Sequence, residues 1–545
     1  MKEYLRSVIS ESLKQFDLSD EDLPDEIEIE KPNQPEHGDA ATNIAMMLAR
    51  PLRNNPRKIA EQIVANLDYD SRRIKEVEIA GPGFINFRYA DAYLYDELDD
   101  ILSTTTDFGK TDVGKGQKIL VEFVSANPTG PLTVGHGRNA VLGDTIARLL
   151  EWTGAEVDRE YYFNDAGRQM RVLGESVRAR YLQELGRDVE FPEDGYQGEY
   201  IKKIAQALID EHGEALVDAE DVTPFKEKAE ELIFEDIQQT LDRMNIHMDS
   251  FFNEHTLYED GSIDQTVEAF RKKELAYDKD GATWFRTTKF GKDKDTVLVK
   301  STGEPTYRLP DIAYHANKLE RGYDQCIDIF GADHIATYPD VMSGIEALGY
   351  DSSKVDVVVY QFVTLVKEGK PFKMSTRKAN FVTLDELMDE VGSDVTRFFF
   401  LMRDPNTHLE FDIAEAKEAG EKNPVFYLQY AHARIKSILR KVDEEYDFEM
   451  DSNLEVLTHD SEIQLIKTMI RFPQVIRSAA EAREPHRLIN YLNDLASDFT
   501  RFYHDCRILG EAEELVLARS ELARATAQVL ANGLGILGIS APDQM

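Results

Sequence analysis

The sequence predicts an α/β fold built on a parallel sheet, with a smaller α+β module before it and a helical bundle after it. Residues 118–124 and 355–363 form nearly continuous apolar runs, as expected for parallel strands covered on both faces. After about residue 421, strand signals stop and apolar residues recur at helical spacing. The sheet is therefore expected in the middle of the chain.

The first segment, residues 1–105, has the pattern of a separate α+β module. Its apolar spacing predicts helices at 42–48 and 56–67 and short strands at 77–79 and 84–87. One interpretation is an extension that only packs on the rest of the protein; the other is a module with a binding role.

Composition indicates a folded protein of three or four domains. The chain has 545 residues, of which 42% are hydrophobic, and no apolar run approaches the roughly 18 residues that cross a bilayer. The amino terminus lacks the apolar core of a signal peptide, so we expect a cytoplasmic protein with no membrane association. Cys326 and Cys506 are isolated, and we expect no metal site, including at His136, His315 and His334.

The formal charge of −39 makes weak non-specific affinity for nucleic acid the expectation, because nucleic acids are normally met by basic surfaces. A salt-rich cytoplasm that screens and hydrates surface carboxylates would explain the excess, and local basic patches would then be needed to hold any nucleic acid. The alternative is an acidic protein with ordinary charge clustering.

The first run leads into a glycine-lined turn and a helix. Glu122 interrupts the apolar run near its carboxyl end. A buried carboxylate there is costly unless a cation pairs with it, and a cationic substrate would meet that need. Gly135 and Gly137 flank His136 just before a helical pattern, so backbone N–H groups and a helix amino end would face one crevice. The alternative is an ordinary tight bend.

The second run is followed by a turn and a basic loop at 372–378. Its three cations, Lys373, Arg377 and Lys378, would suit the clamping of a triphosphate, whereas a bare charge run is more often solvated surface.

Together, the two motifs resemble the signature pair of class I aminoacyl-tRNA synthetases. Residues 133–136 match the His-Ile-Gly-His element at its last two positions, and residues 373–375 match the start of the Lys-Met-Ser-Lys-Ser loop. The chain resembles the arginyl-tRNA synthetases in particular, because matching segments occur in order along almost its whole length. These segments are 37–43, 80–86, 125–132, 160–168, 306–315, 331–334, 423–434 and 537–543.

The resemblance implies the domain plan. A tRNA-binding add-on domain occupies 1–105, and a Rossmann-type catalytic domain occupies 115–420 with a helical connective insertion at about 175–300. An α-helical anticodon-binding domain occupies 421–545. In this last domain, Tyr430, His432 and Arg434 are candidate tRNA contacts, whereas a helical stripe is expected in the core: Leu488, Tyr491, Leu492, Leu495, Phe499 and Phe502.

The implied activity joins L-arginine to tRNA(Arg) with ATP through arginyl-adenylate, with Mg2+ accompanying the nucleotide and a monomer as the expected state. The implied catalytic residues are His136, Lys373 and Arg377. The implied ATP-binding residues are Asn127, Thr133, Gly135, His136, Gln361, Lys373, Met374 and Ser375. The implied arginine-binding residues are Glu122, Ser125, Asn127, Tyr307 and Asp311. A bidentate carboxylate suits a planar guanidinium; without the resemblance, Asp311 is equally explained as a helix N-cap after Pro310.

The sequence departs from the family pattern in both signatures. Thr133 replaces the first histidine and Thr376 replaces the second lysine, and Gly130 stands where some arginyl enzymes carry a compensating lysine. Compensation by Arg377 or Lys378 is a hypothesis. Two other functions therefore stay open, a tRNA-binding paralogue without efficient catalysis and an adenylate-forming nucleotidyltransferase acting on a small molecule.

Overall fold

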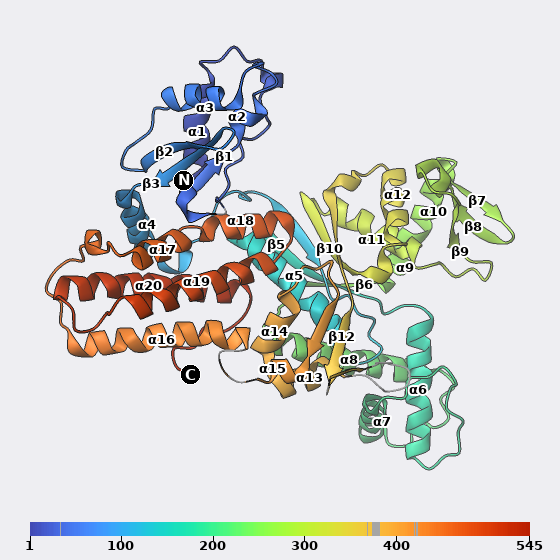
Figure 1. Cartoon of the computed structure of the whole chain (residues 1–545). Helices are drawn as coiled ribbons and strands as arrows, with labels where there is room; N and C mark the ends of the chain where they lie inside the picture. The colour runs from blue at the N-terminus through green and yellow to red at the C-terminus, as the bar shows by residue number, and fades with distance from the viewer. Residues whose placement is uncertain (33, 368, 373–381, 419, 421–422) are drawn as a thin grey trace. The chain divides into compact units, whose positions relative to one another are not determined.

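The structure is a computed structural model that describes residues 1–32, 34–367, 369–372, 382–418, 420 and 423–545 (Figure 1). It divides into two compact units. One combines Met1–Phe108 with Arg434–Arg471 and Ser497–Val529, and the other combines Gly109–Ala433 with Phe472–Ala496 and Leu530–Met545.

The second unit contains the predicted parallel sheet. Its five strands are all parallel and lie in the order β11-β10-β4-β5-β6. They are β4 (Lys118–Glu122), β5 (Glu156–Phe163), β6 (Ser250–Asn253), β10 (Gln325–Gly331) and β11 (Val355–Tyr360). The strand order reverses between β4 and β10, the point at which open α/β sheets bind ligands beyond the carboxyl ends of their strands.

Helices cover both faces of this sheet beside the reversal point (Figure 1). Phe123 packs on α5 (Val134–Trp152), where a Cβ on Gly143 would stand 2.2 Å from its ring. The preceding residue, Glu122, instead meets α11 (Arg308–Glu320). Because successive side chains of an extended chain point to opposite faces, α5 and α11 lie on opposite sides of β4.

The prediction of one strand over 355–363 is wrong at its end. The strand β11 stops at Tyr360, and Val363 begins β12 (Val363–Lys367) in a separate sheet. That sheet has the order β13-β12-β14, with β13 at Lys370–Phe372 and β14 at Leu409–Asp412. Two helices, α13 (Leu384–Val391) and α14 (Ser393–Leu401), lie between β13 and β14 in the chain, and α15 (Ile413–Ala416) follows β14.

The segment expected to be a helical insertion, about 175–300, contains helices and also strands. Three helices pack on one another, namely α6 (Arg168–Glu184), α7 (Glu199–His212) and α8 (Thr223–Arg243). Two shorter helices follow, α9 (His255–Glu259) and α10 (Ser262–Lys272). The segment also supplies β6 to the central sheet and forms an antiparallel sheet of β7 (Ala276–Lys279), β8 (Ala282–Phe285) and β9 (Thr296–Val299). The helix α12 (Tyr338–Leu348) then packs on α11.

The amino-terminal module has the predicted α+β character. Its sheet has the order β1-β3-β2, with β1 at Ala40–Thr42, β2 at Ile74–Ala80 and β3 at Phe84–Tyr89. The predicted helix at 56–67 is α3 (Pro56–Ala65), whereas 42–48 begins as strand and holds only the short α2 (Ile44–Met47). The first and last helices of the module are α1 (Lys2–Leu13) and α4 (Asp91–Thr104).

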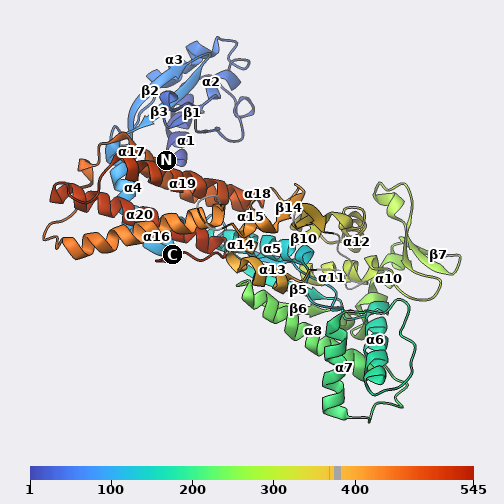
Figure 2. The same ribbon diagram turned by 60° about the horizontal axis from the view of Figure 1, so that its bottom comes forward.

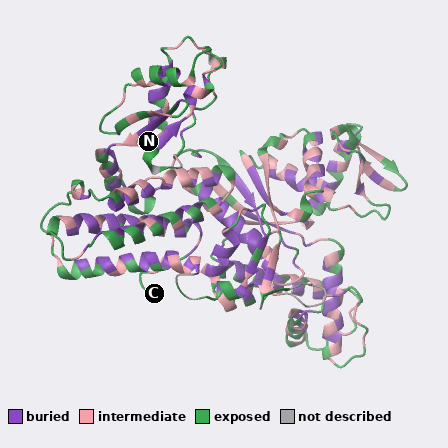
Figure 3. Ribbon diagram, viewed as in Figure 1, coloured by how far each residue is buried: buried purple, intermediate pink, exposed green. Residues whose placement is uncertain are grey.

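After β14 the described residues form helices, as predicted. They are α16 (Pro424–Glu445), α17 (Asp460–Met469), α18 (Phe472–Ala482), α19 (His486–Asp505) and α20 (Glu513–Ile536). The six residues of the predicted core stripe are all buried, and Figure 3 shows the alternation of buried and exposed positions along α19. Figure 2 shows the helices α16, α19 and α20 in a second view. Among the described residues, no helix is both long and apolar enough to span a bilayer.

Candidate active site

The turn that follows β4 is strained. Val124 has φ 66° and Ser125 has φ 40°, in the left-handed region that β-branched residues rarely adopt. Three hydrogen bonds hold it: Val124 N–H donates to Asn139 Oδ1 (2.6 Å), Tyr161 Oη to Ala126 O (2.7 Å) and Tyr162 N–H to Ser125 Oγ (3.1 Å). Backbone strain that the surroundings enforce is characteristic of functional sites.

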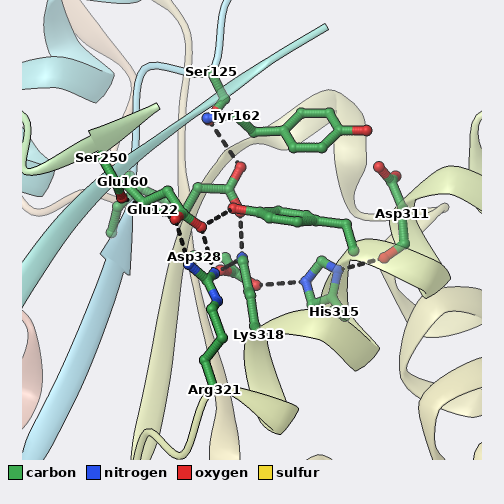
Figure 4. A network of polar contacts seen from close by, with 12 residues as sticks. Glu122, Ser125, Glu160, Tyr162, Ser250, Asp311, His315, Lys318, Arg321 and Asp328 are labelled. Carbon is green, nitrogen blue, oxygen red and sulfur yellow. Dashed lines mark hydrogen bonds and ion pairs between the residues drawn. The ribbon is translucent and has the colours of Figure 1, made fainter. Parts of the chain in front are cut away.

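Glu122 is buried at the end of β4 and is already paired (Figure 4). Ser125 Oγ donates to its Oε1 (2.8 Å), and the ammonium of Lys318 pairs with its Oε2. The sequence indicated correctly that this carboxylate needs a cation, and a residue of the same chain already supplies one. Glu122 is thus held in place before any ligand arrives.

Lys318 is fully buried and connects Glu122 to α11. Its Nζ also donates to Asp328 Oδ1 (2.6 Å), and His315 Nε2 lies 2.8 Å from Asp328 Oδ2. Burial opposes the charge on Lys318, but Asp328 and Glu122 raise its pKa above the usual value. His315 Nδ1 in turn contacts the main-chain oxygen of Asp311 (2.7 Å), so the chain of contacts runs from Glu122 to Asp311.

Asp311 lies in the first turn of α11, whose N-cap is Tyr307, so the N-cap interpretation of Asp311 is wrong. No described residue donates a hydrogen bond to its carboxylate, which Figure 4 shows outside the dashed network, on the side of Tyr162. Burial raises the pKa of Asp311 to about 7, and the nearby carboxylates of Glu122 and Glu254 add to this. The carboxylate is therefore available to a cationic ligand.

A second acidic group lies behind the first. Glu160 accepts both terminal nitrogens of Arg321 (2.6 and 2.7 Å), Tyr314 Oη (2.7 Å) and Ser250 Oγ (2.9 Å). The Tyr314 ring lies tilted against the Tyr162 ring, with the two ring centroids 4.5 Å apart, so hydrogen bonds and ring packing both support this side of the site.

The amino end of α5 supplies the expected anion-binding geometry. His136 Nδ1 accepts a hydrogen bond from Thr133 N–H (3.1 Å), which leaves the ring proton on Nε2 as a donor. Burial lowers the pKa of His136 to about 4, so the ring is neutral at physiological pH. Gly135 lies in the same first turn, at the positive end of the helix dipole, which favours an anion.

The basic loop itself, with Lys373, Met374, Ser375 and Arg377, lies outside the described residues. The described chain that follows the loop is held at the turn before α5. Leu384 N–H donates to Leu132 O (2.8 Å), and Thr133 and Thr383 form an antiparallel bridge. The chain that follows the loop is therefore anchored at the turn that carries His136.

The remaining predicted residues differ in exposure. Asn127 and Tyr307 are exposed, the latter at 71%. Gln361 is half-buried just after β11, where its N–H donates to Pro405 O (2.9 Å). Glu122 and Ser125 are in direct contact, whereas Tyr307 precedes α11 and contributes to the rim.

The three tRNA candidates on α16 lie in different environments. Tyr430 is 44% exposed, whereas His432 is buried with its Nδ1 2.9 Å from Pro542 O. Arg434 is exposed and its guanidinium stacks 4.6 Å from the Tyr503 ring. Tyr430 and Arg434 are thus the two candidates that are accessible to an RNA base.

Sequence reasoning missed the residues that complete the acidic pocket, namely Lys318, Asp328, His315 and Glu254. A signal was present for two of them. His315 and Lys318 follow Asp311 at spacings of four and seven residues, which place all three on one face of a helix. Asp328 and Glu254 come from β10 and from the residue after β6, and only the sheet brings them near.

Comparison with known proteins defines the class. Residues 97–417 match the catalytic-domain model of class I (R) tRNA synthetases. Residues 3–89 match the arginyl-tRNA synthetase N-terminal domain, and residues 428–545 match the DALR anticodon binding domain. The fold is thus that of a class I aminoacyl-tRNA synthetase.

Relatives narrow the class to one family. The chain is 56% identical over its full length to an arginine–tRNA ligase of Salinibacter ruber, with 100% of both chains covered, and 53% identical to that of Desulfotalea psychrophila over 95% of this chain and 94% of that one. A solved structure of a candidate arginyl-tRNA synthetase from Campylobacter jejuni superposes with a TM-score of 0.76 at 33% identity, covering 83% of this chain and 99% of that one. The arginyl-tRNA synthetase of Thermus thermophilus shares the fold over both full chains (TM-score 0.79, 23% identity). The chain belongs to the arginine–tRNA ligase family.

Proposed function

We propose that this chain activates L-arginine with ATP to arginyl-adenylate and pyrophosphate, and then transfers arginine to the 3′-terminal adenosine of tRNA(Arg). The observation that supports the proposal is that two suitable groups belong to the helices next to the reversal of strand order. Asp311, whose carboxylate has no hydrogen-bond donor among the described residues, lies in the first turn of α11 before β10, and His136 lies in the first turn of α5 after β4. The first matches a cationic side chain and the second matches a triphosphate.

Activation needs positioning more than acid–base chemistry. The arginine carboxylate is ionised at neutral pH and attacks the α-phosphorus, while pyrophosphate leaves. Asp311 and Glu122 would hold the guanidinium, with Tyr307 at the rim and Ser125 or Asn127 at the α-amino group. A guanidinium-reading pocket leaves unpaired charge with other amino acids, so discrimination follows from the site itself.

On the nucleotide side, neutral His136 would donate Nε2–H to a phosphate oxygen, and Thr133, Gly135 and Gln361 would complete the pocket. Lys373, Met374, Ser375 and Arg377 would close on the departing pyrophosphate. Mg2+ that accompanies ATP would supply further stabilisation of the charge on the phosphates. Tyr430 and Arg434 would contact tRNA, and we expect the protein to act as a monomer in the cytoplasm.

The test is arginine-dependent ATP–pyrophosphate exchange, with arginine, lysine or glutamate, with and without tRNA. Exchange and tRNA charging with arginine alone are expected. In Asp311→Asn we expect kcat/KM for arginine to fall at least about 100-fold, since a charged contact is lost. The exposed Asp264→Asn on α10 is the matched control and should be unchanged. Binding of tRNA without ATP–pyrophosphate exchange would instead favour a non-catalytic paralogue. ATP–pyrophosphate exchange that depends on a carboxylic acid other than arginine would favour a nucleotidyltransferase.

A further inference from the structure

Two adjacent residues in the first turns of α5, Arg138 and Asn139, are buried and have no part in the chemistry above. We infer that they are positioning residues for opposite halves of the activation site, Asn139 for arginine and Arg138 for ATP. This inference rests on the proposed function.

Asn139 fixes the strained turn after β4. Its Oδ1 accepts the Val124 N–H (2.6 Å), and its Nδ2 donates to Ile329 O in β10 (2.9 Å). One amide therefore joins the turn after β4 to the neighbouring strand β10, which requires a side chain that both donates and accepts.

The conformation of this turn determines where two side chains on the proposed arginine side lie. Without the bond to Asn139, Val124 has no described side chain to hold its N–H, and a valine at φ 66° would relax toward an extended conformation. The next residue, Ser125, carries the hydroxyl that donates to Glu122 Oε1. Relaxation would thus displace both groups on the arginine side while leaving the amino end of α5 in place.

Arg138 points to a different part of the unit. Its Nη1 donates to Gln361 O (2.6 Å) and Thr407 O (2.9 Å), and its Nη2 donates to Asp404 O (3.0 Å). Burial lowers the pKa of Arg138 to about 10, so the guanidinium remains charged at neutral pH. Its planar set of donors suits three carbonyl oxygens at once.

These contacts fix the position of Gln361 from both sides. Its carbonyl accepts from Arg138, and its N–H donates to Pro405 O in the 404–407 loop that Arg138 also holds. Gln361 belongs to the nucleotide side of the proposed site. Neighbouring positions of a helix point about 100° apart, which explains how two adjacent residues serve two substrates.

The experiment compares Asn139→Leu with Arg138→Met. Both remove hydrogen bonds and keep comparable volume. For Asn139→Leu we expect KM for arginine to rise about tenfold with KM for ATP within about twofold, and for Arg138→Met the reverse. A residue that only stabilises the fold would lower the unfolding temperature without splitting the two KM values.

Two more conservative variants keep the inference testable if Asn139→Leu or Arg138→Met does not fold. Asn139→Asp keeps the acceptor for Val124 N–H and loses the donor to Ile329 O, and Arg138→Lys keeps the charge but reaches fewer carbonyls; each should show a smaller shift in the same direction. If both KM values move together, or neither moves in folded protein, the inference is overturned. An inactive wild-type chain would overturn the proposed function first.

A second substitution tests whether Asn139 affects arginine binding through the turn after β4. Glycine adopts positive φ without strain, so adding Val124→Gly to Asn139→Leu should return KM for arginine to within about threefold of wild type. The same glycine added to Arg138→Met should leave KM for ATP raised. Failure of the first rescue, or success of the second, contradicts the assignment of Asn139 to the arginine side.

Discussion

Burial and the neighbouring carboxylates of Glu122 and Glu254 raise the pKa of Asp311 to about 7. The charges of His315 and Lys318 on the same helix oppose this rise. The Tyr162 hydroxyl, also near, donates to Glu254 and is not a partner of Asp311. A guanidinium would pair with the ionised carboxylate only. Arginine binding should therefore release a proton from this group.

The first prediction concerns pH. Below about pH 7, arginine must displace the proton, so its affinity should rise up to about tenfold per pH unit and level off above about pH 8. Calorimetric titrations in two buffers of different ionisation heat count the released protons. Glu254→Gln removes one of the charges that raise the pKa of Asp311, so it should move the midpoint to lower pH. Affinity independent of pH from 6 to 8 would contradict the assignment.

Lys318 carries the second prediction. Lys318→Met leaves Glu122 and Asp328 buried without their cation, which should cost about 3–5 kcal/mol of unfolding free energy. Adding Asp328→Asn removes one of the two unpaired charges and should recover part of the loss. Denaturant unfolding measures both variants; equal stability of Lys318→Met and wild type would show that the pairing contributes little.

How much of the site the sequence predicts depends on the range of the contacts. The cost of burying Glu122 is a local property of an apolar strand, and it was correctly read from the sequence. Its partner Lys318 is 196 positions away, and Asn139 reaches Ile329 across 190 positions. Such pairs depend on strand order, which periodicity does not contain, so the sequence did not predict Lys318 as a partner of Glu122.

Among the elements, α5 and α14 are joined by a buried ion pair. Arg397 Nη2 donates to Asp144 Oδ2 (2.6 Å), and its other nitrogens donate to Met244 O (2.7 Å) and Leu537 O (2.8 Å). Burial opposes ionisation of Asp144, but Arg397, Arg148 and Arg159 together lower its pKa. One guanidinium thus ties four segments of the second unit together.

The third prediction follows from this pair. Arg397→Met should cost about 3–5 kcal/mol, because it leaves Asp144 with weaker partners and two carbonyls without donors. The double variant with Asp144→Asn should be more stable than the single one if the unpaired charge dominates the loss. Thermal unfolding of the three proteins at one pH separates the charge from the carbonyl contacts; additive losses would contradict the coupling.

Element boundaries were less predictable than element types. The run 355–363 reads as one strand because Gln361 and Phe362 carry no glycine or proline signal. The chain leaves the sheet there because the main chain of Gln361 forms hydrogen bonds with Pro405 O and with the Arg138 guanidinium. Both partners lie far away in the sequence. The strands β7–β9 were likewise not predicted, because the surrounding segment is highly charged and was expected to be helical.

For the whole molecule, the charge of −39 is the property that the fold does not explain. With 102 acidic and 63 basic residues, most of the excess carboxylates must share the surface, where they repel one another. At about 0.1 M salt this repulsion extends over roughly 10 Å, and at about 1 M over roughly 3 Å. Added salt should therefore favour the compact state.

The last prediction is that the unfolding temperature rises by roughly 5 °C or more between about 0.05 and 1 M KCl. Sucrose at matched osmolality is the control, because it favours burial by exclusion from the surface without screening charge. A larger rise in KCl than in sucrose would support adaptation to a salt-rich cytoplasm. Equal stability at both salt concentrations would mean that the carboxylates are already offset by local pairing, as in an acidic protein with ordinary charge clustering.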